Sequence, residues 1–287
     1  MSRTYDALKK IEKEQPAYKV IGIEEGETPE TQITDAPGVD SVPPDAMPRI
    51  SVTADPGALE TLALETLLAR CPSTVWTPDA KTMLFFGSEE QVGGTEEFRT
   101  LRTQLSNLRE KQPLRRILVT SSVPKEGRSF VAANLAQALA RQPGCRVLLI
   151  DADLRRPSLH SALGTSATPG LSEYLLDETQ EFGIIQRGQM GNLFFIASGR
   201  PVSGQGDVVS NGRLKFLLER LDPGFDWIIL DSPPAMRVSD SSLMATFCDG
   251  VLMVVRSNST PFNLVRKARQ RFAYERLLGV VLNRIPE

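Results

Sequence analysis

The residues best suited to chemistry lie in three short stretches of the sequence. The first, "SSVPKEGRSF" at residues 121–130, places Gly127 and Ser129 on either side of Arg128. The apolar run "RILVT" precedes this stretch and the helical pattern "FVAANLAQALAR" overlaps its end and continues beyond it, so the loop joins a predicted strand to a predicted helix. Backbone N–H groups and the positive end of a helix converge on an anion in such a loop. The stretch therefore predicts a phosphate-binding site in which Ser129 offers its hydroxyl to a magnesium ion.

The other two stretches supply carboxylates at the ends of predicted strands. "VLLIDADLRRP" carries Asp151 and Asp153 at alternate positions, and "WIILDSPPA" carries Asp231 before two prolines that end the strand. A single Asp in such a place is most simply a helix cap or a turn residue. Three acids beside a phosphate loop also provide oxygen ligands for Mg²⁺ and a group that orients or deprotonates an attacking hydroxyl. Together the three stretches predict a magnesium–nucleotide site.

The elements that must position these residues alternate regularly from about Glu96 onward. Short apolar runs such as "RVLLID" and "GVLMVV" alternate with helical stretches such as "GRLKFLLERL" and the last one, at residues 260–278. Strands that are apolar on both faces and separated by helices are typical of a parallel sheet covered on both sides. We therefore expect a doubly wound, mostly parallel α/β fold, with its ligand at the carboxyl ends of the strands.

The first third of the chain is predicted to lie outside this fold. Residues 1–20 carry a short amphipathic helical pattern, with a solvated terminus as the alternative, because so short a helix is marginal alone. Residues 21–60 are rich in acids and prolines, contain one basic residue, Arg49, and predict a largely disordered linker. Residues 61–94 are expected to form a partly ordered connector, and residues 95–287 the nucleotide-binding domain.

Composition narrows the class of protein. The 33 Lys and Arg residues nearly balance the 35 Asp and Glu residues, and a net charge of −2 gives no basic footprint for nucleic acid. The three cysteines lack CxxC or CxxH spacing, which argues against both a disulfide framework and a zinc site. No run approaches the roughly 18 apolar residues of a membrane span. We therefore expect a cytoplasmic protein that only a partner could bring to a membrane.

The three motifs together resemble those of the bacterial tyrosine kinases of capsule and exopolysaccharide systems, relatives of the MinD and ParA ATPases. The loop is similar to the family pattern S-x-x-P-G-E-G-K-S, and "LLIDADLRRP" and "ILDSPP" match the second and third motifs. The resemblance implies that ATP contacts the loop and that the asparagine of "LGVVLNR" lies near the adenine. The residues concerned are Pro124, Lys125, Glu126, Gly127, Arg128, Ser129, Phe130 and Asn283.

The resemblance implies transfer of the γ-phosphoryl group of ATP to a protein tyrosine. Ser129, Asp153 and Asp231 would then bind Mg²⁺. Either Asp151 or Asp153 would orient or deprotonate the tyrosine, and Arg128 would stand in the place of the catalytic lysine. The implied activating partner is a membrane chain-length-determinant, or polysaccharide co-polymerase, protein, so the location expected is cytoplasmic and peripheral to the membrane.

An upstream element also resembles the family. "EEFRTLRTQL" is similar to E-x-x-R-x-x-R, here Glu96, Arg99 and Arg102, which in the family helps to assemble a ring of subunits. A homo-oligomer is therefore expected.

The loop departs from the family pattern at two positions. Arg128 replaces a lysine by a longer, planar and bidentate side chain. Lys125 stands where the family usually has glycine, which requires that the backbone there be reachable by a residue with a Cβ. These changes favour an alternative function, a nucleotide-binding scaffold with weak or no phosphoryl transfer. A ParA-like ATPase that positions cargo is disfavoured, because Val123 replaces the extra lysine of that group.

The tyrosines depart from the pattern as well. The sequence ends in "LNRIPE", without the cluster of tyrosines with which these kinases usually end. Tyr174 and Tyr274 are expected to pack in the interior, so Tyr5 and Tyr18 are the candidate acceptors. Trp76 and Trp227 are likewise expected in the core or at a domain contact.

Overall fold

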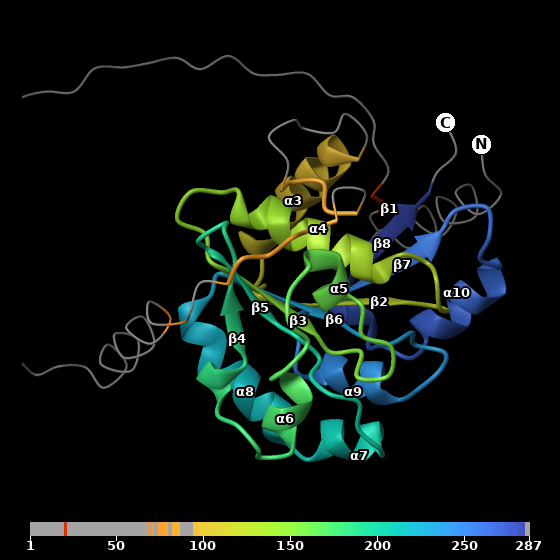
Figure 1. Ribbon diagram of the computed structural model, residues 1–287. Coiled ribbons are helices and arrows are strands. Elements are labelled where there is room, and N and C mark those ends of the chain that lie inside the picture. The colour runs from red at the N-terminus through yellow and green to blue at the C-terminus, as the bar shows by residue number, and fades with distance from the viewer. Residues whose placement is uncertain are drawn as a thin grey trace, which may run out of the picture.

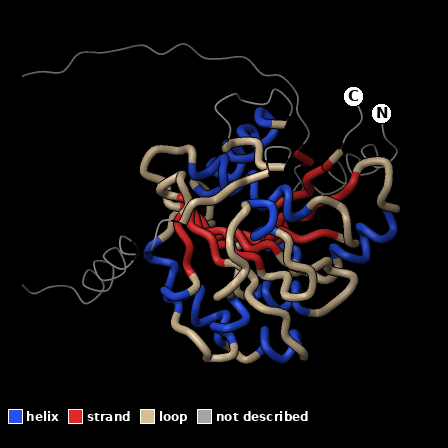
Figure 2. Tube along the Cα trace, viewed as in Figure 1, coloured by secondary structure: helices blue, strands red, loops and turns tan. Residues whose placement is uncertain are grey.

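A single parallel sheet organises the molecule. The computed structural model describes residues 20–21, 68, 71, 74–79, 82–86 and 94–284. Within these residues eight strands form one sheet in the order β1-β8-β7-β2-β6-β3-β5-β4 (Figures 1 and 2). Every neighbouring pair is parallel except β4 and β5. The prediction of a doubly wound, mostly parallel α/β fold is confirmed.

Six of the strands coincide with the predicted apolar runs, whereas β1 and β4 were not predicted. Both are short and lie at the two edges of the sheet. β1 falls on the predicted boundary between the N-terminal helix and the acidic linker; the rest of both segments lies outside the described residues. The strands are β1 (Val20–Ile21), β2 (Arg116–Ser121), β3 (Val147–Asp151), β4 (Ile185–Arg187), β5 (Leu193–Ile196), β6 (Trp227–Asp231), β7 (Gly250–Arg256) and β8 (Leu277–Asn283).

Helices cover both faces of the sheet. Figure 1 shows α3 and α4 on one side and α6, α7, α8 and α9 on the other. No helix in the described part of the chain is long and apolar enough to cross a membrane. The helices are α3 (Thr95–Arg109), α4 (Arg128–Ala140), α5 (Leu159–Leu163), α6 (Leu171–Leu175), α7 (Gln205–Ser210), α8 (Arg213–Leu221), α9 (Asp240–Thr246) and α10 (Phe262–Arg269), with 3₁₀ turns η1 (Glu181–Gly183), η2 (Asp222–Gly224) and η3 (Tyr274–Arg276).

The two-sided cover explains why the strands read as continuous apolar runs. Successive side chains of a strand point to opposite faces. In β3, Leu148 and Ile150 join the core beneath α8 and α9, and Val147 and Leu149 join the core beneath α3 and α4. Both sets are almost fully buried. A strand buried on both faces has apolar residues at every position and not only at alternate ones. Its composition therefore indicates that it lies inside the sheet and not at an edge.

α4 is buried around nearly its whole circumference. α3, residues 74–79 and residues 82–86 pack with α4 in one core. Trp76 is 1% exposed, and its ring lies edge-on to that of Phe195 at 6.1 Å. The backbone N–H of Leu84 donates to Asn134 Oδ1 of α4 at 2.9 Å. Within the predicted connector, Met83, Leu84 and Phe85 are therefore part of the core, and both tryptophans are core residues, since Trp227 is 2% exposed.

The last predicted helix is shorter than the pattern indicated. α10 ends at Arg269, and Leu277, which the helical prediction included, begins β8 instead. The backbone at Ala273 is extended, and the following residues pair with β7 along the sheet. Tyr274 therefore lies on a surface turn and is 46% exposed, with the Arg269 guanidinium 5.2 Å from its ring. Its predicted interior position was wrong, whereas Tyr174 is 2% exposed as predicted.

Candidate functional site

The loop between β2 and α4 has the backbone geometry of an anion site. Gly127, the N-cap of α4, has a φ of 92° and no side chain with which to cap the first helical turn. The first N–H groups of a helix have no partner within the helix, so these amides are available to an external acceptor. Lys125 also adopts a positive φ, 67°. A residue with a Cβ there is strained by about 1 kcal/mol, so the loop keeps its curvature at a position where glycine is preferred.

Glu126 fastens this loop from the inside. Its carboxylate is 2% exposed. Oε2 accepts the N–H of Val123 at 2.7 Å, and Oε1 accepts the hydroxyl of Thr260 at 2.5 Å and the N–H of Arg256 at 3.4 Å. Glu126 was named among the nucleotide-binding residues of the loop, and its side chain braces that loop against Arg256 and Thr260. Sequence reasoning missed this bracing role, because the donors, Arg256 and Thr260, lie 130 or more residues away from the carboxylate and leave no local pattern.

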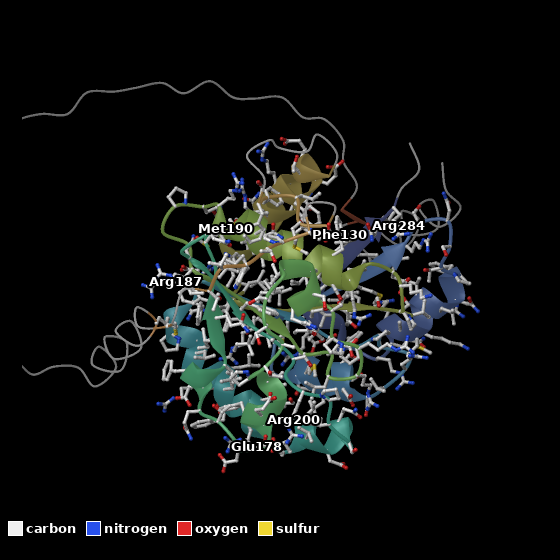
Figure 3. All side chains as sticks on the ribbon, in the orientation of Figure 1. Phe130, Glu178, Arg187, Met190, Arg200 and Arg284 are labelled. Atoms are coloured by element: carbon white, nitrogen blue, oxygen red, sulfur yellow. The ribbon has the colours of Figure 1, made fainter. Side chains whose placement is uncertain are left out.

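Asn283 closes the loop against β8. Its Nδ2 donates to the carbonyl of Glu126 at 2.9 Å. A Cβ at Gly127 would come within 1.9 Å of that nitrogen, so only glycine fits between the loop and β8. Phe130, in the first turn of α4, packs against Phe98 at 5.8 Å, and Figure 3 shows Phe130 and Arg284 near the same end of the molecule. Asn283 therefore lies beside the loop, and its predicted place near the adenine stays a prediction.

The three predicted aspartates converge next to the loop. Asp151 and Asp231 are register partners at the ends of β3 and β6. Asp151 Oδ2 accepts the N–H groups of Ser158 and Leu159, each at 3.1 Å. Its side chain therefore holds the start of α5. Its other oxygen is buried without a hydrogen-bond partner.

Asp153 faces the loop directly. Its Oδ1 accepts the N–H groups of Arg155 at 3.2 Å and Arg156 at 3.1 Å, which fixes the turn after β3. Its Oδ2 forms an ion pair with Nη2 of Arg128. Asp151 therefore contacts the start of α5, whereas Asp153 contacts Arg128 of the loop.

Arg128 lies at the centre of these acids. Its residue is 9% exposed, and besides the pair with Asp153 its Nε is 3.4 Å from Oδ1 of Asp231. One guanidinium therefore links the ends of β3 and β6 to the first residue of α4. The planar side chain meets two carboxylates at once, which a lysine ammonium does with less fixed geometry.

Burial sets the protonation of the acids. Burial, reinforced by the charge of Asp231, raises the pKa of Asp151 to about 8, against the opposing effect of the Leu159 and Ser158 N–H groups. Burial also raises the pKa of Asp231 to about 6, while Arg128 and the Ser129 hydroxyl lower it. Crowded carboxylates in an apolar surrounding do not all ionise. The site therefore favours the arrival of further positive charge.

The donor set suits a hard cation that brings some of its own ligands. Both oxygens of Asp231 are buried without a well-aligned hydrogen-bond donor. Carboxylate oxygens of this kind are ligands for Mg²⁺. In the described parts of the chain no group of three or more His, Cys, Asp or Glu side chains could hold a metal ion by itself. Phosphate oxygens and water would have to complete the shell, as Mg²⁺ commonly requires.

The residues predicted for subunit assembly lie on α3. Glu96 and Arg99 form an ion pair on one surface of this helix. Arg102 instead turns inward, where its Nη1 donates to the carbonyl of Ala138 in α4 at 3.0 Å. Arg102 thus joins α3 to α4 within one chain.

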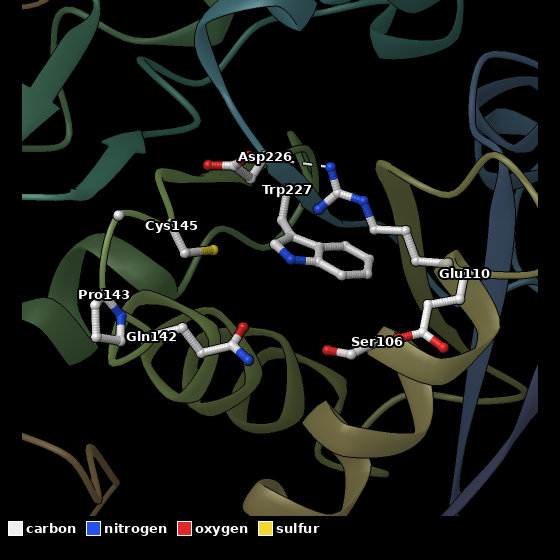
Figure 4. A pocket seen from close by; sticks show the side chains of 9 residues that line it. Ser106, Glu110, Gln142, Pro143, Cys145, Asp226 and Trp227 are labelled. Carbon is white, nitrogen blue, oxygen red and sulfur yellow. Dashed lines mark ion pairs between the residues drawn. The ribbon is translucent and has the colours of Figure 1, made fainter. Parts of the chain in front are cut away.

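Two recesses lie at opposite edges of the sheet. A narrow one of about 30 Å³ adjoins the loop and includes Arg128 and Asp153 in its wall. A wider one of about 500 Å³ lies at the amino ends of β3 and β6, and none of the predicted site residues lines it. Figure 4 shows the wider one, where Asp226 faces a guanidinium and Trp227 lies between them and the ends of α3 and α4. The guanidinium is that of Arg109, 4.0 Å from Asp226 Oδ1 and 4.8 Å from the ring centroid of Trp227.

Comparisons with known proteins agree with this geometry. A family model described as "ParA: NUBPL iron-transfer P-loop NTPase" matches residues 114–284. Tyrosine-protein kinase YwqD of Bacillus subtilis is 32% identical over 68% of this chain and 83% of its own length. Putative tyrosine-protein kinase EpsB of Ralstonia nicotianae is 31% identical over 66% of this chain, which spans only 25% of that relative. The kinase domain of the Escherichia coli tyrosine kinase ETK is 30% identical with a TM-score of 0.63, over 67% of this chain and 78% of that domain.

Proposed function

The chain belongs to the bacterial tyrosine-protein kinases of the ParA-type P-loop NTPases, and on that premise we propose that it transfers the γ-phosphoryl group of ATP to protein tyrosines in exopolysaccharide or capsule synthesis. The observation that carries this proposal is the convergence of Arg128, Asp153 and Asp231 at the free amides of α4. Relatives are named as tyrosine kinases, so the comparisons favour a kinase over the nucleotide-bound scaffold.

The residues divide the chemistry between them. The amides of Arg128, Ser129 and Phe130 bind the phosphates, while the Ser129 hydroxyl and Asp231 hold Mg²⁺, which when bound neutralises charge on the transferred group. Asp153 faces the recess beside the loop and accepts the proton of the tyrosine hydroxyl. The Oη–P bond forms as the bond from the γ-phosphorus to the bridging oxygen breaks, and ADP leaves. Asp151 acts behind them by positioning α5.

Arg128 makes the loop a variant of the usual lysine-containing motif. With ATP bound, its guanidinium exchanges a carboxylate for phosphate oxygens, which it contacts in a bidentate manner. Of the two carboxylates that pair with Arg128, Asp231 is the one assigned to the metal. Binding of phosphate and binding of metal are therefore coupled through one side chain.

The setting of the reaction follows the family. We propose a homo-oligomer at the cytoplasmic face of the membrane, activated by a membrane chain-length-determinant or polysaccharide co-polymerase protein. Tyr5 and Tyr18 remain candidate acceptors outside the described residues, and the exposed Tyr274 becomes a third. Mass spectrometry of the protein after incubation with ATP identifies which of them is modified.

The test is phosphoryl transfer from Mg²⁺-ATP to a tyrosine peptide by the purified full chain. Asp153→Asn is expected to lower the rate about 100-fold or more, because it removes the proton acceptor. Asp231→Asn is expected to weaken ATP binding in the presence of Mg²⁺ and to leave binding without the metal little changed. Asp226→Asn, at the opposite edge, is the matched control and should behave as the wild type.

Calorimetry of the same samples separates the outcomes. Transfer that survives in Asp153→Asn contradicts the assigned role. ATP binding without transfer in the wild type, with transfer restored by Arg128→Lys, would identify the chain as a nucleotide-bound scaffold. If neither the wild type nor Arg128→Lys bound ATP, the proposal that this site binds a nucleotide would be wrong.

A further inference from the structure

The narrow recess beside the phosphate loop has a wall of arginines. Arg155 and Arg156 come from the turn after β3, and Arg237 comes from the loop between β6 and α9. Arg128 and Asp153 belong to the same recess. The recess is therefore continuous with the position at which the phosphoryl group would leave ATP.

The positive charge of this wall is largely uncompensated. Arg155 is held in place by Asp240, whose Oδ2 is 3.3 Å from Nε and 3.2 Å from Nη2. Arg156 and Arg237 are exposed, and neither side chain has an ion pair or hydrogen bond with any residue that the structure describes. Elsewhere on the surface, Arg200 pairs with Glu178 (both labelled in Figure 3) and Arg220 pairs with Glu181.

Prolines form the apolar part of the recess. Pro233 and Pro234 are buried, and Pro124 faces them from the loop. The turn that carries them is fixed, because the hydroxyl of Thr120 donates to the Pro233 carbonyl at 3.0 Å and the N–H of Ala235 donates to the Ser121 carbonyl at 2.8 Å. The recess therefore combines an apolar floor with a cationic rim.

We propose that this recess selects the acceptor: it binds a tyrosine flanked by acidic residues. The tyrosine presents its hydroxyl to Asp153 from the mouth of the recess, and neighbouring carboxylates pair with the exposed Arg156 and Arg237. Charge-assisted pairs with arginine are strong and directional. The proposal rests on the proposed kinase function and adds to it the class of substrate. The recess, of about 30 Å³, has room for a hydroxyl group but not for a whole aromatic ring, so the ring stays at its mouth and the flanking residues meet the exposed arginines.

The experiment compares three synthetic peptides that carry one tyrosine flanked by glutamates, by glutamines or by lysines. The full chain is tested as wild type and as the double variant Arg156→Glu with Arg237→Glu. The matched control is Arg266→Glu with Arg271→Glu, which makes the same change of charge at exposed positions on and after α10. Fluorescence anisotropy measures peptide binding, and kcat/KM measures transfer.

The wild type is expected to prefer the glutamate peptide over the lysine peptide by about 10-fold or more, and the recess variant to reverse that order. The glutamine peptide should change by less than about 3-fold. The preference should shrink as salt is raised, because the rim is exposed. The control variant should keep the order of the wild type.

Peptide binding is measured without ATP, so the recess is tested even if no transfer occurs. Binding that does not change in the recess variant, or changes equally in the control, overturns the proposal. A recess variant that binds peptides normally but loses affinity for vesicles of anionic lipid also overturns it, and assigns the arginines to a membrane. Absence of transfer by every protein, with the expected order of binding, contradicts the kinase function alone.

Discussion

The two edges of the sheet each bring an arginine close to aspartate, with very different results. At the carboxyl edge Arg128 is 9% exposed and contacts two nearly inaccessible carboxylates beside a recess of about 30 Å³. At the amino edge the side chain of Arg109 is 33% exposed and faces one half-exposed carboxylate, that of Asp226, beside a recess of about 500 Å³. The larger recess thus has fewer buried charged groups than the smaller one. Buried acids close to free helix amides therefore indicate the candidate site better than the volume of a recess does.

The direction of the helices accounts for this difference. In a parallel sheet, the helix that follows a strand begins at the carboxyl edge and ends at the amino edge. α4 therefore presents its N-terminus to the phosphate loop and its C-terminus to the wider recess, which Gln142 and Gly144 line. The N-terminus of a helix attracts anions and the C-terminus repels them. A phosphate ligand is favoured at one edge only.

The strongest way to break this comparison is to remove each arginine in turn. Arg128→Met leaves Asp153 and Asp231 without their cation, and the free energy of unfolding is expected to fall by about 3–5 kcal/mol. Arg109→Met removes a half-exposed pair and a stacking contact, and should cost about 1 kcal/mol. Urea unfolding of both variants at pH 7 measures the difference. Equal losses would show that the two edges do not differ as their burial indicates.

A second test of the difference between the two edges follows the stability of the nucleotide-free protein as the pH is changed. The native pKa of Asp151, about 8, exceeds its ordinary value of 3.8, so between these values the native state holds a proton that the unfolded state has lost. Raising the pH then favours unfolding, by up to about 1.4 kcal/mol for each pH unit.

Asp151→Asn should flatten the decline in stability between pH 5 and pH 8, because it removes the titrating group at the carboxyl edge. Asp226→Asn, at the amino edge, should leave the decline in place. Thermal unfolding across this range gives both slopes. A decline of the same size in Asp151→Asn and wild type would contradict the assignment.

The smallest effect is expected at Lys125. Lys125→Gly relieves the positive φ and should raise the free energy of unfolding by about 1 kcal/mol or less, since glycine also gains freedom in the unfolded chain. Lys215→Gly, in the first turn of α8 at an exposed position, should instead lower it by up to about 1 kcal/mol. Chemical unfolding of the two variants side by side tests whether the loop is strained. A loss of stability in Lys125→Gly would show that it is not.

The sequence predicted the elements that depend on local pattern. The continuous apolar runs predicted β3 and β6. The change from an apolar strand pattern before residues 121–130 to a helical pattern after them predicted the phosphate loop. Asp151, Asp153 and Asp231 were placed at the strand ends because such strands end at one edge of the sheet. These features depend on composition within a few residues, which a single sequence displays.

What could not be predicted depends on contacts distant in the chain. The partners of Arg128 are 25 and 103 residues away, as the pairs with Asp153 and Asp231 show. Glu126 was taken as a ligand contact, since nothing near it indicates that Thr260 would cover its carboxylate. Tyr274 was placed in a helix because its neighbours have helical spacing, and the pairing of β8 with β7 overrode that preference.

The position of β8 also has a consequence for the order of events during synthesis. β1 and β8 are neighbours in the sheet, although Ile21 and its partner Val281 stand near opposite ends of the numbering. On the ribosome, Asn283 emerges after every other residue of the site, so its hydrogen bond to the carbonyl of Glu126 forms late. Until β8 joins the sheet, the loop lacks this brace. A nascent chain can thus carry the complete phosphate loop before it carries the means to hold that loop in place.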